Sequence, residues 1–311
     1  MPKTLAIVGN CQVGGLEKAF KLATKDIRPT PFFLAELGGS HDKVSFAEEM
    51  KTYDLVYAHQ SEDPNFGIEA LRSAGIGVKE IPVVSFPAFH PDMVYAQKLR
   101  ADGGLDVLKS PVGENHSALI LYGFHLGLNA EQIARLFCED IYQTVGFFEA
   151  WPAAWEALAQ AGKRAELPLE SMMLSWSRQG PFMHTLNHPK VGVLADIARA
   201  IAKKEGAQLR PAASDAYLID DLMTSTIWPI YPEIGRRLGI EGSQLFKRAG
   251  VTQFYDLEQM ITESLAIYAL ENRDDVKCWR IDLWNFLPGV RDKFLACAGV
   301  VQSSDGLSVA V

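Results

Sequence analysis

Short apolar runs alternate with helix-like patterns over the first part of the chain. Apolar runs of strand length cover residues 4–8, 31–34, 54–58 and 81–86, and helical spacing covers 13–23, 46–51 and 68–74. This alternation is typical of an α/β fold with a mostly parallel sheet. Prolines at positions 29 and 31 place the second run at a sheet edge or in an extended loop, because proline cannot donate to a strand ladder.

The pattern changes after Pro111, where long amphipathic segments follow one another. These segments are residues 130–141, 147–161, 192–205 and 257–271. Asn129 and Gln132 form a capping-box pattern at the start of the first, and Pro189 suits the first position of the third helix. We therefore expect an α/β part over residues 1–110 and a mainly helical part over 111–311. The second part would pack on the first in one continuous globular unit.

Composition narrows the class of protein. The 311 residues are 48% hydrophobic and 22% charged, with a net charge of −8, which argues against binding nucleic acid or an anionic membrane. No apolar run has the length of a bilayer span, and the first residues do not resemble a signal peptide. The four cysteines form no CxxC pair, so we expect neither a disulfide framework nor a cysteine-rich zinc site. A cytoplasmic protein with reduced thiols fits best, and its oligomeric state stays open.

The segment Gly9-Asn10-Cys11-Gln12 carries the most specific chemical signal. It follows the first apolar run and precedes a helical pattern, so Cys11 is expected at a helix N-terminus. Free backbone N–H groups there lower the pKa of a thiol, as a cysteine nucleophile requires. The alternative is a small buried cysteine in a glycine-rich turn. Neither the dinucleotide fingerprint nor a P-loop fits, since each lacks required residues.

Other polar loops are expected beside this segment. Residues 58–61 and 85–92 also follow predicted strands, and ligands gather at the carboxyl ends of parallel strands. Ser85, His90 and Asp92 lie in the second of these loops. A cysteine nucleophile needs a base, and His90 and His188 are both held by a following proline. Packing of either histidine in a loop is the alternative, and the residues alone do not select one of the seven.

Two further patterns concern metals and phosphates. His184 and His188 have the spacing of zinc ligands, but Thr185 stands where the metalloprotease pattern has glutamate, so we expect no metal. Basic pairs occur at Lys203-Lys204, Arg236-Arg237 and Lys247-Arg248. They suit a phosphate-bearing cofactor, or are simply solvated helix faces.

The segment Gly9-Asn10-Cys11-Gln12, followed by Phe89-His90-Pro91-Asp92 and Asn187-His188-Pro189, resembles the WcbI family of polysaccharide-biosynthesis proteins. The resemblance covers most of the chain in order and length. Members are regarded as acetyltransferases that act on capsular sugars and bind coenzyme A. A looser similarity connects the chain to SGNH-type hydrolases and acyltransferases. The chain departs from that pattern, with cysteine for serine and no Asp-x-x-His.

The resemblance implies an acyl-coenzyme A-dependent O-acetyltransferase for a sugar or a capsular or surface polysaccharide precursor. Cys11 would be the nucleophile or an anchor beside the thioester, with His188 or His90 as base. Asn10, Gln12, Ser85 and Asp92 would shape the oxyanion site. The phosphates of coenzyme A would meet Arg236, Arg237, Lys247 and Arg248. Alternatives are a thiol-dependent esterase or thioesterase, and a non-catalytic coenzyme- or glycan-binding protein.

Overall fold

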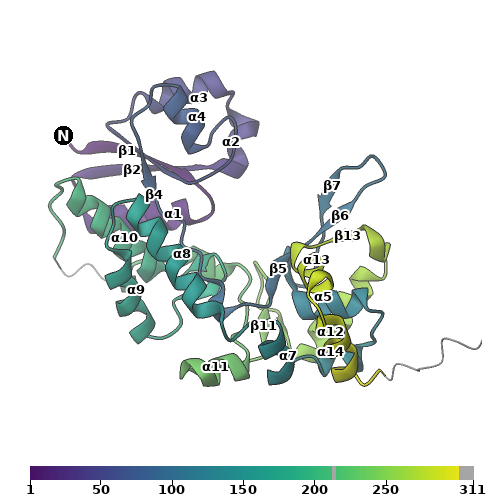
Figure 1. Ribbon diagram of the computed structural model, residues 1–311. Helices are drawn as coiled ribbons and strands as arrows, with labels where there is room; N and C mark the ends of the chain where they lie inside the picture. The colour runs from purple at the N-terminus through teal and green to yellow at the C-terminus, as the bar shows by residue number, and fades with distance from the viewer. Residues whose placement is uncertain (212–214, 301–311) are drawn as a thin grey trace, which may run out of the picture. The chain divides into compact units, whose positions relative to one another are not determined.

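The chain forms two compact units. The computed structural model describes residues 1–211 and 215–300 (Figure 1). Unit 1 contains Met1–Phe89 and Trp151–Ser225, and unit 2 contains His90–Ala150 and the chain from Thr226 onward. This division does not follow the expected boundary near residue 110, because helices from residues 151–205 belong with the N-terminal sheet.

Unit 1 is an α/β unit. Its elements are β1 (Lys3–Gly9), α1 (Gln12–Ala23), β2 (Ile27–Phe33), α2 (Leu34–Ser40), α3 (Lys43–Met50), β3 (Leu55–His59), α4 (Ile68–Ser73), β4 (Val78–Ile81), η1 (Pro87–Phe89), α8 (Ala150–Arg164), α9 (Leu169–Arg178), β9 (Met183–Thr185), β10 (His188–Pro189), α10 (Val191–Lys204), η2 (Asp215–Tyr217) and η3 (Asp221–Thr224). The first four strands form a sheet in the order β2-β1-β3-β4. All its pairs are parallel, and the proline-containing β2 is an edge strand, as predicted.

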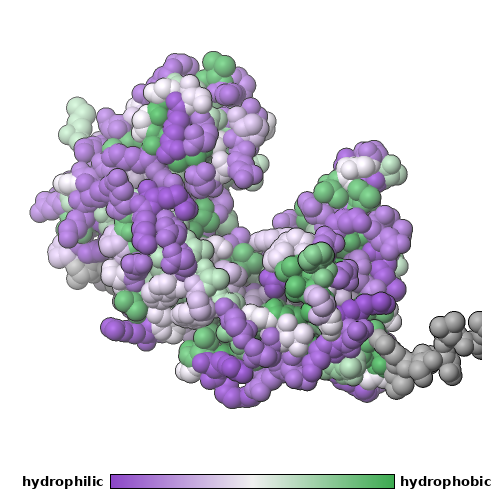
Figure 2. Space-filling model, in the orientation of Figure 1, coloured by the Kyte–Doolittle hydropathy of each residue, from purple (hydrophilic) through white to green (hydrophobic). Residues whose placement is uncertain are grey.

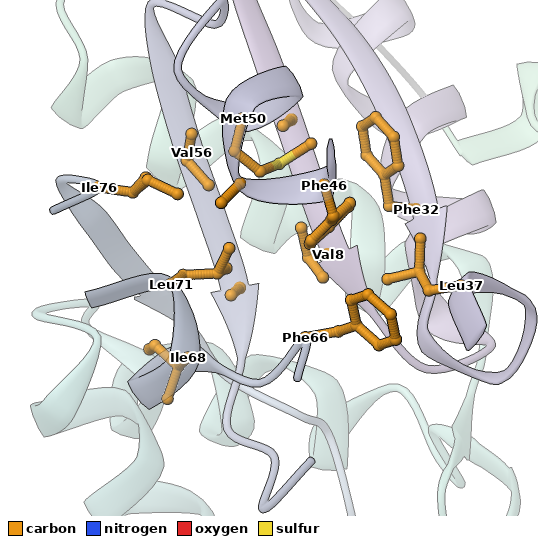
Figure 3. Close-up of a cluster of buried hydrophobic side chains, with 13 residues drawn as sticks. Val8, Phe32, Leu37, Phe46, Met50, Val56, Phe66, Ile68, Leu71 and Ile76 are labelled. Atoms are coloured by element: carbon orange, nitrogen blue, oxygen red, sulfur yellow. The ribbon is translucent and has the colours of Figure 1, made fainter. Parts of the chain in front are cut away.

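Both faces of this sheet are covered by helices. Alternate residues of β1 point to opposite faces, and Leu5–Val8 are buried throughout. Helices α2, α3 and α4 lie on one face, where Phe46 contacts Phe32 and Phe66 edge-on (Figure 3). Helices α1 and α10 lie on the other face (Figure 1). The predicted α/β class with a mainly helical remainder is confirmed.

Some sequence-predicted elements differ from the observed ones. The strand predicted over 81–86 is wrong in its bounds, because β4 ends at Ile81 and Phe86 packs beside Trp151 and Phe182. Helix α10 begins at Val191, not at Pro189, because Pro189 belongs to the short strand β10.

The helix predicted over 130–141 is two helices. Asn129 and Gln132 do form the predicted capping box of α6. The N–H groups of Leu136 and Phe137 then bond three residues back, to Ile133 and Ala134, which tightens the turn and ends α6.

Unit 2 is mainly helical with small sheets. Its elements are β5 (Met93–Tyr95), β6 (Gln97–Leu99), β7 (Leu105–Val107), β8 (Asn115–Ser117), α5 (Ala118–His125), α6 (Ala130–Ala134), α7 (Glu139–Thr144), α11 (Pro232–Leu238), β11 (Phe246–Lys247), β12 (Phe254–Tyr255), α12 (Leu257–Tyr268), η4 (Arg273–Asp275), β13 (Val276–Lys277), α13 (Trp279–Phe286) and α14 (Val290–Cys297). Helix α5 is its centre, because every residue of Ala118–Phe124 is buried.

The surface of unit 2 carries apolar side chains on the hairpin of β6 and β7. Leu99, Leu105 and Val107 are exposed there, and Figure 2 shows the hairpin in part green. Over the described residues, no helix has both the length and the apolar character needed to cross a membrane.

The ends of β1 and β3 approach each other closely at Gly9. A Cβ on Gly9 would lie 2.2 Å from Nδ1 and 2.6 Å from Cγ of His59. His59 is 2% exposed, so its ring has little room to move away. The absence of a side chain at Gly9 therefore permits the imidazole to lie beside the backbone of the first loop.

We predict that Gly9→Ala destabilises the protein by about 1–3 kcal/mol, because the methyl group must displace a buried ring. Gly38→Ala is the matched control, since its Cβ would meet nothing within 4 Å in helix α2. That variant should be neutral or slightly stabilising. Thermal unfolding followed by circular dichroism measures both, and equal melting temperatures for the two variants would contradict the close approach.

Candidate functional site

The candidate site lies at a topological switch point of the unit 1 sheet. From β1 the chain passes to β2 on one side, and β3 then pairs with the other side of β1. Open α/β sheets bind ligands at such a point, outside the carboxyl ends of the strands, because the loops that follow the two strands lead to opposite sides. Cys11 follows β1 and His59 ends β3, so both flank this position.

His59 holds the backbone of the first loop. The N–H of Asn10 donates to His59 Nδ1 at 3.2 Å, which leaves the ring proton on Nε2. Burial lowers the pKa of His59 to about 4, so the imidazole is neutral at pH 7. Within the described chain, Nε2 is buried without a hydrogen-bond partner. His59 lies in the predicted loop of residues 58–61 but was not among the predicted site residues. Its position at the end of a buried strand could have indicated a place in the site.

Cys11 precedes the first residue of α1 and has an exposed side chain. The protein around the sulfur nevertheless desolvates the thiolate and raises the pKa of Cys11 above its usual value; its own backbone N–H lowers it by less. The expectation of a lowered thiol pKa is therefore wrong. Desolvation is the cause, and two N–H groups at the start of α1 are already bonded: Asn10 Oδ1 accepts from Gln12 N–H at 3.0 Å, and the Asn10 carbonyl accepts from Val13 N–H at 3.1 Å. The N–H groups that would stabilise a thiolate are thus engaged.

Gln12 connects three segments of unit 1. Its side chain is 0% exposed, and Nε2 donates to the carbonyls of Val84 and Asn187, each at 2.9 Å. Its Oε1 accepts from the N–H of Val84 at 3.1 Å. Both amide protons are therefore engaged by backbone carbonyls. The arrangement brings the loop that carries His188 and the segment after β4 against the start of α1.

Ser85 belongs to the same set of contacts. Its Oγ donates to the carbonyl of Leu186 at 3.3 Å, and the N–H of Phe86 donates to the same carbonyl at 2.7 Å. The segment after β4 is thereby bonded to the chain just before His188.

His188 lies beside a second histidine and a carboxylate. His188 pairs with Thr185 across strands β10 and β9. His184 Nε2 lies 2.9 Å from Asp220 Oδ2, which also accepts from the N–H of Val191 at 3.0 Å. Burial, and then the nearby His184, lower the pKa of His188, so it is neutral at pH 7. Its Nδ1 is buried with no hydrogen-bond partner among the described residues.

Asp220 is a residue that sequence reasoning missed. Burial alone would raise the pKa of its carboxyl, but hydrogen bonds from His184 and from the N–H groups of Val191 and Met223 lower it. It is therefore an ionised partner for His184. No sequence signal marked it, because the contact joins residues from different segments of unit 1 and no short motif spans them.

His90 and Asp92 belong to unit 2, not to the unit that carries Cys11. His90 Nδ1 lies 3.3 Å from the carbonyl of Pro229. Asp92 is 0% exposed and accepts from Leu119 N–H at 2.9 Å and from Tyr231 Oη at 2.6 Å. Burial raises the pKa of Asp92. Its observed contacts hold the start of α5 against Tyr231.

The four basic candidates for coenzyme A also belong to unit 2. Arg236 pairs with Glu139 at 2.6 Å, and the Arg237 guanidinium lies 4.0 Å from the centre of the Phe148 ring. Lys247 lies in β11, and Arg248 follows it. As for metals, no group of three or more His, Cys, Asp or Glu side chains in residues 1–211 and 215–300 could hold an ion.

Comparison with known proteins identifies the family. The family model described as polysaccharide biosynthesis enzyme WcbI matches residues 4–210. The chain therefore belongs to the WcbI family of polysaccharide-biosynthesis enzymes. No protein of curated function matches it.

A solved structure of WcbI has the same fold. It is 15% identical in sequence, with a TM-score of 0.69, and the alignment covers 96% of this chain and 99% of that one. It is described as a novel polysaccharide biosynthesis enzyme, in native form without a disulfide bond between coenzyme A and one of its cysteines.

We predict that Cys11 reacts with iodoacetamide with an apparent pKa above that of an ordinary cysteine thiol, because the surrounding protein desolvates the thiolate. Its exposure permits reaction, whereas burial of Cys278 at 4% exposure should make that thiol the slowest. Alkylation rates between pH 6 and 11, resolved by peptide mass spectrometry, give the value. The unfolded protein in denaturant is the control, and an apparent pKa lower in the folded than in the unfolded protein would contradict the prediction.

Proposed function

We propose that the protein is an acyl-coenzyme A-dependent O-acetyltransferase that acts on a sugar of a surface or capsular polysaccharide precursor. The observation that carries the proposal is an exposed thiol at the switch point, joined through Gln12 to the loop of a neutral histidine. Membership of the WcbI family supports the substrate class. The description of the WcbI structure names a disulfide bond between coenzyme A and one of its cysteines, which that native form lacks, and this mention of coenzyme A supports the acyl donor.

His188 is our candidate base, with His90 second. Its neutral imidazole can take a proton at pH 7, and His188 shares unit 1 with Cys11. His184, held by Asp220, lies close enough to lower the pKa of His188, and we assign both the role of positioning residues. The raised pKa of Cys11 means that the thiol does not ionise unaided at neutral pH, so a base is needed whichever group attacks.

Two routes are consistent with these roles. In the first, His188 takes the Cys11 proton, the thiolate attacks the acetyl carbonyl, and coenzyme A leaves as the thiol with that proton. The sugar hydroxyl then gives its proton to His188 and attacks the acetyl-cysteine, and Cys11 leaves as the thiol with that proton. In the second, His188 takes the proton of the sugar hydroxyl, which attacks the thioester directly beside Cys11, and coenzyme A leaves as the thiol with that proton.

The oxyanion donors are proposed from the same loop. Gln12 Nε2 is engaged by backbone carbonyls, so we assign Gln12 a positioning role. The Cys11 N–H and the Asn10 Nδ2 group are the proposed donors, with Ser85 nearby in the bonded network. Arg236, Arg237, Lys247 and Arg248 remain candidates for the phosphates, and Asp92 a candidate for shaping the acceptor site.

We predict that the protein releases coenzyme A from acetyl-coenzyme A only when a sugar acceptor is present. Release is followed with a thiol reagent, and the acetylated sugar by mass spectrometry. Cys11→Ala should lower the rate at least 100-fold, as expected when a nucleophile or anchor is lost. The control Cys278→Ala removes a thiol from unit 2.

The outcomes separate the alternative functions. Equal turnover without acceptor would indicate an esterase or thioesterase, and binding of acetyl-coenzyme A without turnover by any tested sugar would indicate a binding protein. If acetyl-coenzyme A acetylates Cys11 when no acceptor is present, the reaction follows the first route, through an acetyl-cysteine.

We predict that kcat/KM falls as the pH is lowered, with a midpoint below 6.5, the usual histidine value. The lowered pKa of His188 keeps the base neutral above that midpoint, and protonation removes it below. His188→Gln should lower the rate by about 10²–10⁴-fold and abolish the fall of kcat/KM at low pH, which is the acidic limb of the profile. His41→Gln, a surface histidine paired with Glu49, is the control. Loss of the limb in His90→Gln instead would assign the base to His90.

A further inference from the structure

Two thiols of unit 2 lie in contact although they are 159 residues apart in sequence. The Sγ atoms of Cys138 and Cys297 are 3.5 Å apart. Cys138 directly precedes α7, and Cys297 is the last residue of α14. The two helices lie side by side in Figure 1. Sequence analysis expected unpaired, reduced thiols because no short spacing joins these positions.

Neighbouring contacts hold the two sulfurs in place. Lys293, one turn before Cys297, pairs with Asp140 just after Cys138 at 2.7 Å. The Cys297 thiol also donates to the carbonyl of Arg135 at 3.2 Å. The Lys293–Asp140 ion pair and the bond from Cys297 to the Arg135 carbonyl therefore hold the two sulfurs next to each other. Both contacts exist while the two thiols are reduced.

The pair is accessible to small reagents. Cys138 and Cys297 are both partly exposed, whereas Cys278 is buried. Burial, and then the adjacent Cys138, raise the pKa of Cys297 to about 11, while Lys293 acts in the opposite direction. The sulfurs need to approach by about 1.5 Å to reach the length of a disulfide bond.

We propose that Cys138 and Cys297 form a dithiol modification site that is oxidised to an intramolecular disulfide by a low-molecular-weight disulfide. One cysteine thiolate attacks a sulfur of the small disulfide, forms a mixed disulfide and releases one small thiolate. The other cysteine thiolate attacks the protein sulfur of that mixed disulfide and releases the second. Two protein thiols are oxidised, one small disulfide is reduced to two thiols, and the two protons pass to the leaving thiolates.

The disulfide would join α14 to α7 and close a loop of 159 residues. Closing a long loop restricts the unfolded chain and so raises stability. It would add a covalent link beside the Lys293–Asp140 ion pair. The proposal does not depend on the acetyltransferase function.

The test uses the full-length reduced protein and oxidised glutathione as the probe. In the non-reducing digest of the oxidised protein we expect a cross-link between the peptides of Cys138 and Cys297. The Cys11→Ser variant, which lacks the exposed third thiol, should have an intact mass lower by two hydrogen atoms. The melting temperature should rise by roughly 5 °C or more, and dithiothreitol should reverse these changes. A digest in which the two peptides stay unlinked while both thiols are alkylated by iodoacetamide would overturn the proposal.

Single-cysteine variants are the matched controls. In Cys138→Ser the remaining Cys297 has no partner, so it should retain one glutathione, and Cys297→Ser should do the same at Cys138. Neither variant should gain thermal stability on oxidation. Cys11→Ser should still form the cross-link. Formation of an intramolecular disulfide by Cys138→Ser or Cys297→Ser would assign the chemistry to other cysteines and overturn the proposal.

Discussion

The candidate site depends on the buried side chain of Gln12. A fully enclosed amide must have its donors and acceptor engaged, because leaving a buried polar group unpaired costs about 1–3 kcal/mol. Gln12 meets this condition only when the segment at Val84 and the loop at Asn187 both lie against the start of α1. The positions of the three segments therefore depend on one another through Gln12. These contacts bring Cys11 and His188 into the same region of unit 1.

Burial then decides the charge state of the groups around this network. His59 and His188 both remain neutral at pH 7 because the protein desolvates their protonated forms. The same effect raises the pKa of Cys11, and Asn10 engages the N–H groups at the start of α1. Cys11 is therefore exposed, but its thiol does not ionise readily at neutral pH. Such a thiol needs a base to ionise at neutral pH, and the neutral His188 in the adjoining loop is the candidate we propose.

Unit 2 uses its polar residues mainly for packing. Asp92 engages the N–H of Leu119 and the hydroxyl of Tyr231, and so joins α5 to a distant part of the chain. Asp92, part of a motif that resembles a site signature in sequence, thus has a structural role within its own unit. The contact between Cys138 and Cys297 adds a chemical property to the same unit that no part of the site requires.

The sequence by itself determined the local structure of this protein and the position of the Cys11 thiol after the first strand. The apolar run before Gly9, the prolines of β2 and the capping box at Asn129 each act over a few residues, so their patterns predicted the parallel sheet, its edge and the start of α6. Only the tertiary structure decided that Gln12 bonds to the loop at Asn187, that Asp220 pairs with His184 and that Cys138 meets Cys297. The physical reason is that burial and hydrogen bonding between distant segments depend on how the chain packs, which no local periodicity encodes.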